Sequence, residues 1–259
     1  MLNRQEKRLN RIIKMLGLSN PTTVNKIASV MEVSHMTIRR DLEVLKDKNM
    51  VDIFHGGVVL KEGIRKNKHN PYSLSYANKQ MNAEKKNIAV KATSYVNSKD
   101  TIIIDTGSTI EYFARSLPEG LSMTVICFTI NSLLHISKLK KTKIIFPGGY
   151  FHENTLMFES EESRKLIENN PANTAFISAS GISLEKGVSC SNDYELSVKK
   201  EMLNLSEKKI LLVDSSKFNK VHSTLFAKIT DFDIIISDSK IPEEYKKYCK
   251  KNSIELILV

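Results

Sequence analysis

From residue 84 to the end of the chain, short apolar runs alternate with stretches of helical periodicity. The apolar runs include "TIIID" (101–105), "TAFISAS" (174–180) and "KILLVD" (209–214). A strand that is apolar at nearly every position must be covered on both faces, as happens when helices flank a parallel sheet. The alternation therefore predicts an α/β domain with a mainly parallel sheet.

The same alternation gives approximate bounds for the elements. The expected strands cover residues 101–105, 123–129, 143–147, 174–180, 209–214, 233–237 and 254–259. The expected helices cover residues 84–97, 108–117, 131–139, 161–169, 192–205 and 242–251. In open sheets of this kind, ligands bind beyond the carboxyl ends of the strands.

The first part of the chain has a different pattern, three short helices with a tight turn before the third. Residues 4–18 carry apolar residues at helical spacing, and Thr22 or Thr23 can cap a second helix. Ser34 is a good N-cap for a third helix from His35 to about Lys48. The third helix is expected to bury an apolar stripe formed by Met36, Ile38, Leu42 and Leu45.

The third helix begins with "SHMTIRRDLEVL" and gathers its cations near its N-terminal end. The helix dipole is already positive there, so Arg39 and Arg40 gain little unless an anion approaches. Arginine can form paired hydrogen bonds to guanine, and His35 and Thr37 project near the same end. Asp41 is expected to orient an arginine or to cap locally. The alternative is a surface helix whose arginines have no partner.

A strand, turn and strand follow the third helix in "NMVDIFHGGVVL", residues 49–60. A short hairpin after such a helix is a wing, and the whole arrangement is a winged helix-turn-helix. His55 at the tip either approaches the DNA backbone or minor groove, or is an exposed turn histidine without a role.

The charge distribution agrees with a nucleic-acid partner for the first part. The chain has 259 residues and a net charge of +10, and 41% of its residues are hydrophobic, enough for a buried core. Residues 1–66 hold 13 Lys and Arg against 7 Asp and Glu. This concentration of positive charge is typical of a part that meets phosphates. A solvated lysine-rich surface would give similar numbers.

Other residue types exclude several classes of protein. The cysteines, Cys127, Cys190 and Cys249, are far apart and are expected to be reduced thiols in a cytoplasmic protein. No apolar run is long enough to span a membrane, and the polar N-terminus is unlike a signal peptide. The six histidines form no metal-ligand spacing, so we expect neither a metal site nor a cofactor.

The stretch "VSHMTIRRDLEVLKDKNMVDIFHGGVV" resembles the signature of the DeoR family of bacterial transcription regulators. The resemblance covers the Ser, the Thr, the Arg-Arg-Asp-Leu run and the His-Gly-Gly wing in order. It implies that Ser34, Thr37, Arg39, Arg40 and His55 lie at or near operator DNA. His35 joins this candidate set through its place at the start of the helix.

Residues 61–83 show no sustained periodicity and carry basic and polar residues around Pro71. We expect three parts: a winged helix-turn-helix DNA-binding domain at residues 1–60, a linker at 61–83, and an α/β effector-binding domain at 84–259. The expected fold class is therefore multidomain α+β.

Four polar loops are expected at one edge of the sheet. They are "DTGST" (105–109), "PGG" (147–149), "SGISLEKG" (180–187) and "DSSKF" (214–218). In the first loop, Gly107 permits a tight turn, while backbone N–H groups and the hydroxyls of Ser108 and Thr109 can face an anion. A capped turn between strand and helix uses the same residues. Four such loops together favour a phosphorylated polar ligand.

The resemblance extends through these loops to about residue 220. The effector domain of the DeoR family has a fold similar to ribose-5-phosphate isomerase and glucosamine-6-phosphate deaminase, and it implies a sugar phosphate or similar metabolite here. The candidate effector-binding residues are Asp105, Thr106, Gly107, Ser108, Thr109, Thr129, Asn131, Gly148, Gly149, Gly181, Glu195, Lys199, Asp214 and Lys217.

Two departures from the family pattern bear on the ligand. Ile130 separates Thr129 from Asn131, which are usually adjacent, and Glu159 and Ser160 stand where a glycine is expected. The extra negative charge could bias ligand choice or lie in solvent.

The resulting hypothesis is a repressor of a sugar catabolic operon that a phosphorylated sugar releases from its operator. It would act as a homo-oligomer, a dimer or a tetramer, on operator half-sites, without a membrane partner. An activator is an alternative.

The rival class is a sugar-phosphate isomerase or deaminase, with Asp105, Glu195, Asp214 and Lys217 as acid, base and phosphate groups. A constitutive nucleoid protein, which needs no pocket, is a third class. An attached DNA-reading domain argues for the regulator, so we expect no enzymatic activity.

Overall fold

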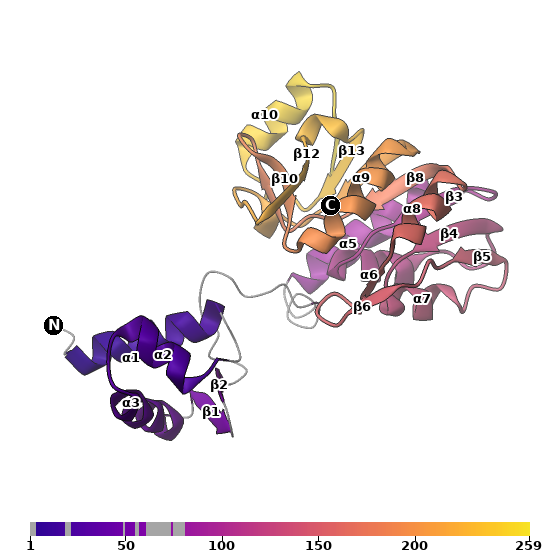
Figure 1. Cartoon of the computed structure of the whole chain (residues 1–259). Coiled ribbons are helices and arrows are strands. Elements are labelled where there is room, and N and C mark those ends of the chain that lie inside the picture. Colours follow the sequence, from indigo (N-terminus) through magenta and orange to yellow (C-terminus); the bar gives the residue numbers. More distant parts are fainter. Residues whose placement is uncertain (1–3, 19–21, 49, 55–56, 61–73, 75–80) are drawn as a thin grey trace. The chain divides into compact units, whose positions relative to one another are not determined.

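The computed structural model describes residues 4–18, 22–48, 50–54, 57–60, 74 and 81–259. The chain divides into two compact units, residues 1–70 and residues 71–259 (Figure 1). The expected linker, residues 61–83, lies outside the described residues except for Leu74 and residues 81–83. Its last two residues already belong to a helix.

The first unit contains three helices and a hairpin, as the sequence predicts. The helices are α1 (Arg4–Leu18), α2 (Val24–Met31) and α3 (His35–Asp47), and β1 (Val51–Phe54) pairs antiparallel with β2 (Gly57–Leu60). Thr23 caps α2 by accepting a hydrogen bond from the Lys26 N–H, and Ser34 caps α3 by accepting one from the Thr37 N–H. The unit is therefore a winged helix-turn-helix.

The core of the first unit differs from the prediction at one residue. Ile38, Leu42 and Leu45 of α3 are buried, but Met36 is 67% exposed. Met36 precedes Ile38 by two residues, about 200° around the helix, and therefore lies on the opposite face. The buried core comprises Leu9, Ile12, Leu16, Ile27, Ala28, Met31, Ile38, Leu42, Leu45, Val51 and Val58.

The second unit is built on a seven-stranded sheet in which every pairing is parallel. The strand order is β14-β13-β11-β8-β3-β4-β5. The strands are β3 (Thr101–Ile104), β4 (Met123–Cys127), β5 (Thr142–Ile145), β8 (Ala172–Ile177), β11 (Ser206–Leu212), β13 (Ile234–Ser237) and β14 (Glu255–Leu258). All seven predicted strands are present, with ends that differ by a few residues.

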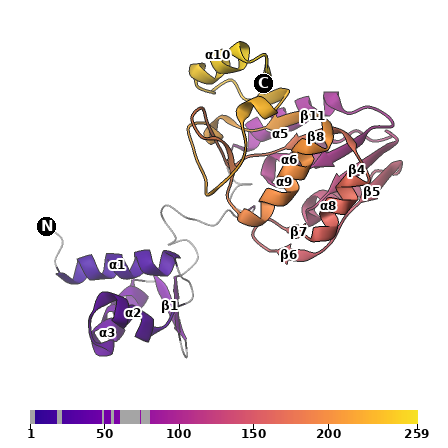
Figure 2. The same ribbon diagram turned by 45° about the horizontal axis from the view of Figure 1, so that its top comes forward.

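Helices cover both faces of the sheet (Figures 1 and 2). On one face pack α5 (Asn82–Ala92), α6 (Ser108–Ser116) and α7 (Ile130–Ile136), and on the other pack α8 (Glu161–Glu168), α9 (Leu196–Asn204) and α10 (Glu243–Lys251). Successive strand residues enter different cores: Ile102 and Ile104 lie under α5 and α6, and Ile103 lies on the side of α9. This two-sided burial explains the continuous apolar runs.

Short antiparallel strands between the predicted elements were not expected. One hairpin pairs β6 (Tyr150–His152) with β7 (Met157–Glu159), and a small sheet joins β9 (Gly181–Ser183), β10 (Gly187–Cys190) and β12 (Thr224–Ala227). The segment 180–187, expected as a loop, therefore contains β9 and the turn into β10. Strands of only three or four residues are too short to show a clear alternation.

The described residues of the second unit also form four single-turn 3₁₀ helices: η1 (Thr93–Tyr95), η2 (Asp193–Glu195), η3 (Ser215–Lys217) and η4 (Ile229–Asp231). The predicted helix 192–205 is thus η2 followed directly by α9. Among the helices that the structure describes, none combines the length and the apolar character needed to cross a membrane.

Candidate ligand site and nucleic-acid interface

The N-terminal end of α3 presents most of the predicted DNA-binding side chains. Ser34, His35, Arg39 and Arg40 are exposed, and Thr37 is half-buried. The Ser34 and Thr37 hydroxyls are 2.9 Å apart. A shallow hollow at this end is lined by Gln5, Arg8, Ser34, Met36, Thr37, Arg40 and Asp41. His55 lies outside the described residues, so its position at the wing tip stays a prediction.

Asp41 orients an arginine, and the arginine belongs to α1. The Asp41 side chain is 1% exposed and forms an ion pair with Arg8, whose Nη2 lies 3.0 Å from Asp41 Oδ1. The Gln5 amide also donates to Asp41 Oδ1, at 3.2 Å. The hydrogen bond to the carboxylate raises the pKa of Arg8 above its usual value. Asp41 therefore ties α3 to α1 through its ion pair with Arg8.

The order of the strands creates a second candidate site. The chain runs outward from β3 to β4 and β5 and then returns to β8 on the other side of β3. The loops after β3 and β8 consequently diverge, and such a switch point is where parallel sheets bind ligands. A cavity lies there, lined by Thr106, Gly107, Ser108, Thr109, Ser178, Ala179, Ser180, Glu195, Lys199 and Lys217.

The loop after β3 is shaped by a glycine. Gly107 has φ of +99°, a conformation that other residues rarely adopt, and it is the N-cap of α6. The turn brings the backbone and hydroxyl groups of residues 106–109 to the cavity, with the positive end of the helix dipole behind them. The predicted turn at Gly107 is confirmed.

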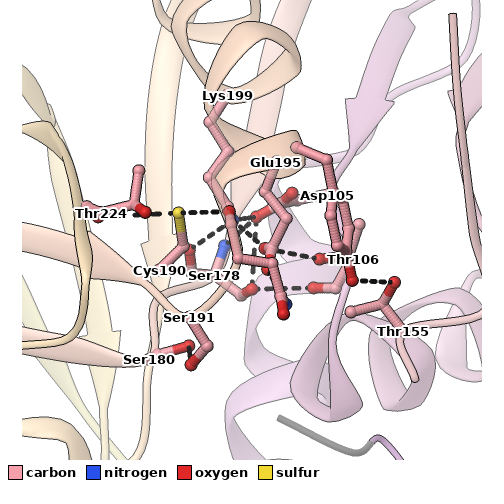
Figure 3. Close-up of polar contacts among 12 residues, drawn as sticks. Asp105, Thr106, Thr155, Ser178, Ser180, Cys190, Ser191, Glu195, Lys199 and Thr224 are labelled. Atoms are coloured by element: carbon pink, nitrogen blue, oxygen red, sulfur yellow. Dashed lines mark hydrogen bonds and ion pairs between the residues drawn. The ribbon is translucent and has the colours of Figure 1, made fainter. Parts of the chain in front are cut away.

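A buried ion cluster forms one side of the cavity (Figure 3). Lys199 Nζ lies 2.5 Å from Asp105 Oδ2 and 3.6 Å from Glu195 Oε2, and the Lys199 and Asp105 side chains are each 1% exposed. Burial lowers the pKa of Lys199, but Asp105 and Glu195 together raise it above its usual value. Lys199 therefore stays charged inside the domain.

Asp105 also fixes the loop after β8. Its Oδ2 accepts hydrogen bonds from the Ser178 N–H, at 2.8 Å, and from the Ser178 hydroxyl, at 3.2 Å. Lys199 donates to the Ser178 carbonyl oxygen, at 3.1 Å. Asp105 is not among the residues lining the cavity. Asp105 thus holds two parts of the cavity wall in place, the lining residue Lys199 and the loop that carries Ser178.

Glu195 is the acidic group that lines the cavity. Its Oε2 accepts a hydrogen bond from the Thr106 hydroxyl, at 3.3 Å, and its Oε1 accepts one from the Asn192 amide, at 2.6 Å. Burial raises the pKa of Glu195 above its usual value, although Lys199 opposes that shift. A carboxyl group in this position can bind a hydroxyl group of a ligand.

Lys217 brings a second cation to the cavity. It lies in η3, which follows β11, and burial lowers its pKa while Asp214 opposes that shift. Asp214 is buried and accepts a hydrogen bond from the Ser216 N–H, at 3.0 Å, so it shapes the loop that carries Lys217. An anionic group in the cavity would face both Lys217 and the start of α6, because both line it.

Five further candidate residues lie outside the lining of the cavity. The Thr129 hydroxyl donates to Ser132 at the start of α7, and the Asn131 amide donates to Glu111, at 2.9 Å each. A Cβ at Gly149 would lie 2.3 Å from the Glu159 carbonyl oxygen, and one at Gly181 would lie 2.5 Å from the Lys220 carbonyl oxygen. Gly148, with φ of +71°, completes the turn before β6.

The two departures from the family pattern have local explanations. Glu159 ends β7, and its Oε2 lies 3.2 Å from His152 Nε2 on the paired strand. Ser160 is the N-cap of α8 and accepts a hydrogen bond from the Ser163 N–H. Both residues line a groove with Glu161, Glu168 and Glu201 that is separate from the cavity described above.

Sequence reasoning missed Ser178 and Asn192, whereas Ser180 was already the first residue of the predicted loop 180–187. Ser178 was placed inside a predicted strand at 174–180, but β8 ends at Ile177 and leaves it in the loop. The Ser-Ala-Ser run after an apolar strand was the available indication. Within the described part of the chain, no group of three His, Cys, Asp or Glu side chains is placed to hold a metal ion.

Comparison with known proteins assigns both units. Residues 8–63 match the model of the DeoR-like helix-turn-helix domain, and residues 80–239 match that of the DeoR C-terminal sensor domain. The deoxyribose operon repressor of Escherichia coli K12 is 30% identical over 257 residues, which cover 99% of this chain and 100% of the repressor. This chain belongs to the DeoR family. It is a DNA-binding transcriptional regulator with a sensor domain.

Other DeoR-family regulators are similarly related to this chain. The L-fucose operon activator of Haemophilus influenzae is 31% identical over 252 residues, covering 95% of this chain and 97% of the activator. Among solved structures, ribose 5-phosphate isomerase A from Neisseria gonorrhoeae aligns with 53% of this chain and 53% of its own, at 19% identity and a TM-score of 0.39.

Proposed function

We propose that this DeoR-family regulator represses an operon for sugar catabolism and leaves its operator when a phosphorylated sugar binds the sensor domain. The observation that carries the proposal is the composition of the cavity at the β3/β8 switch point. Hydroxyl and backbone groups of residues 106–109, together with Lys217, suit a phosphate. Glu195 at the same cavity suits a sugar hydroxyl.

The relatives support a sugar-related role and leave the sign of regulation to experiment. One is named a deoxyribose operon repressor and another an L-fucose operon activator. A repressor that a metabolite releases needs a ligand that prefers the free protein to the DNA complex. Typical couplings of about 1–3 kcal/mol correspond to roughly 5- to 150-fold changes in affinity.

In the complex with DNA, the N-terminal end of α3 would enter the major groove. His35, Arg39 and Arg40 are exposed there. Ser34 and Thr37 can reach a phosphate or base edge, and His55 would contact the backbone from the wing. A homo-oligomer would place two or more such helices on operator half-sites, with residues 61–83 as the connection between domains.

Chromosomal DNA as partner and three free, buried cysteines fit a cytoplasmic protein.

The proposal includes the absence of catalysis. Asp105 and Asp214, two of the three candidate acid and base groups, hold Ser178, Lys199 and Ser216 in place and are not lining groups of the cavity. The third, Glu195, lines the cavity but is engaged by Thr106, Asn192 and Lys199. A general acid or base must reach the proton that it transfers. Turnover of a sugar phosphate by the purified protein would revive the isomerase or deaminase alternative.

The test measures binding of the full chain to DNA from upstream of its own and neighbouring genes, at fixed salt. A panel of pentose and hexose phosphates is added to the complex, with the unphosphorylated sugars as matched controls. We expect one phosphate to weaken operator binding at least about fivefold while its unphosphorylated counterpart does not.

Other outcomes would contradict parts of the proposal. Tighter operator binding in the presence of the phosphate would contradict release by the effector. Specific DNA binding that no sugar phosphate alters would remove the effector assignment. Release by the unphosphorylated sugar alone would contradict the phosphate site at Lys217.

A further inference from the structure

Leu74 is the single described residue between residues 61 and 80, and it is fixed to the sensor domain. Its side chain is 3% exposed, and its backbone N–H donates a hydrogen bond to the Asn154 carbonyl oxygen, at 2.9 Å. Asn154 lies in the turn between β6 and β7. Leu74 is therefore attached to the sensor domain at this turn.

The side chain of Asn154 connects the same turn to the segment before α9. Its Nδ2 donates to Asn192 Oδ1, at 3.1 Å, and its Oδ1 accepts a hydrogen bond from the Tyr194 hydroxyl, at 2.8 Å. The Tyr194 ring also stacks on His152, with 3.6 Å between ring centroids. One residue thus holds Leu74 through its backbone and contacts η2 and its N-cap through its side chain.

The connection continues to the cavity. Asn192 Nδ2 donates to Glu195 Oε1, at 2.6 Å. The Asn192 amide therefore donates to Glu195 through Nδ2 and accepts from Asn154 through Oδ1. Glu195 lines the cavity and also bonds Thr106, another lining residue. Three consecutive hydrogen bonds therefore lead from a carboxyl group in the cavity to the backbone of Leu74.

We propose that Asn154 is a positioning residue for the allosteric response and that the relay Glu195–Asn192–Asn154–Leu74 carries the effector state of the cavity to the interdomain segment. This inference rests on the proposed function. A ligand hydroxyl that bonds Glu195 competes with the Asn192 amide, and a displaced Asn192 loses its bond to Asn154. The hydrogen bond that holds Leu74 to the turn then opens more readily.

A substitution at Asn154 separates this role from ligand binding. Asn154→Ala keeps the backbone carbonyl that Leu74 uses and removes the bonds to Asn192 and Tyr194. Asn154 is not a lining residue of the cavity, so the sugar phosphate should still bind. The matched control is Asn173→Ala, which removes hydrogen bonds to the Thr101 N–H and to Glu207 at the opposite ends of the strands.

The decisive experiment measures operator affinity of the full chain with and without the panel compound that calorimetry shows to bind. We expect the wild type and Asn173→Ala to lose operator affinity at least about fivefold, and Asn154→Ala to lose less than about twofold. Binding of the compound to free Asn154→Ala should stay within about threefold of wild type, because coupling and intrinsic affinity are separate quantities. An unchanged operator response in Asn154→Ala would overturn the relay.

A second measurement needs no ligand. Hydrogen exchange of the peptide that contains Leu74 should be faster in full-length Asn192→Ala than in wild type or Asn173→Ala, because the turn that holds Leu74 loses its hydrogen bond to Asn192. Equal exchange in all three proteins would contradict the relay even if a sugar phosphate binds. Failure of every sugar phosphate to bind the wild type would instead remove the proposed function, and the exchange result would still decide whether the relay exists.

Discussion

Met36 and Ile38 are both apolar residues in the first turns of α3, yet Met36 is 67% exposed and Ile38 is fully buried. The exposed face that carries Met36 also carries Arg40 at the hollow next to α1. An exposed apolar group beside arginines suits the major groove, where thymine methyl groups offer an apolar contact. At the scale of single residues, the helix face on which an apolar side chain lies decides whether it packs in the core or is exposed.

Arg39→Ala should weaken specific operator binding roughly 5- to 150-fold, because a lost base or phosphate contact costs about 1–3 kcal/mol. Binding of the effector to the free protein should not change. The matched control is Lys46→Ala, which removes the same charge from the last turn of α3. Fluorescence anisotropy with operator DNA at fixed salt makes the comparison, and equal losses in both variants would contradict the placement of Arg39 in the groove.

Lys217→Ala should remove most of the response to a sugar phosphate while operator binding without ligand stays intact. A charged hydrogen bond to a phosphate contributes about 1.5–3 kcal/mol, so the affinity for the effector should fall by roughly one to two orders of magnitude. Lys220→Ala is the matched control, since Lys220 is exposed and lies outside the lining of the cavity. Calorimetric titration of both variants tests the assignment, and retention of wild-type affinity by Lys217→Ala would exclude it.

At the scale of elements, tertiary ion pairs fix helices whose positions the sequence does not specify. Arg8 of α1 and Asp41 of α3 are 33 residues apart in the chain, and Asp105 and Lys199 are 94 apart. Breaking such a pair leaves a buried charge without its partner, whereas replacing both members by apolar residues can restore stability.

Arg8→Ala should therefore lower the stability of the helix-turn-helix unit by about 2 kcal/mol or more, because Asp41 is 1% exposed and loses its main partner. The Arg8 side chain is 23% exposed, which reduces the loss below that of a fully buried pair. Hydrogen exchange of the α3 amides in the full chain gives the stability of this unit. The double variant Arg8→Met/Asp41→Leu should recover most of the loss, and a double variant less stable than Arg8→Ala would contradict this account.

The elements predicted from sequence were those with a long, regular pattern. The apolar runs around Ile103, Phe176 and Leu211 gave strands because both faces of the sheet are buried. The cap at Ser34 and the turn at Gly107 were also predictable, because their geometry depends on adjacent residues. The relay through Asn154 and Asn192 was not, because it depends on a hairpin of three-residue strands and on contacts between distant parts of the chain.

At the scale of the whole molecule, the candidate site depends on the order of the strands in the sheet and not only on which residues form strands. The sequence predicts loops after strands, but it does not state that β8 lies beside β3. That neighbour relation brings Thr106 and Ser180 to one cavity and leaves Thr129 and Gly148 outside it. The same arrangement places Lys85 of α5, which is 1% exposed, close enough to Asp214 and Lys217 to interact with their charges.

Lys85 gives the stability of the sensor domain a specific dependence on pH. Burial lowers the pKa of Lys85 to about 8 from its ordinary value of 10.5, although Asp214 opposes that shift. Below pH 8 the ammonium group is charged in both the folded and the unfolded chain. Between about pH 8 and 10.5 the folded chain has lost this proton while the unfolded chain retains it, so unfolding takes up a proton and stability rises with pH.

We therefore expect the free energy of unfolding of the wild type, relative to Lys85→Met, to increase between pH 7.5 and pH 10, by at most about 3 kcal/mol. Methionine has no charge to lose, so the variant lacks this contribution. Lys86→Met is the matched control, because Lys86 is the exposed neighbour on the same helix and its curve should run parallel to that of the wild type. Urea denaturation at several pH values measures all three proteins. A constant difference between wild type and Lys85→Met over this range would mean that Lys85 keeps its proton in the folded chain, and the attraction of Asp214 would then outweigh the cost of burial.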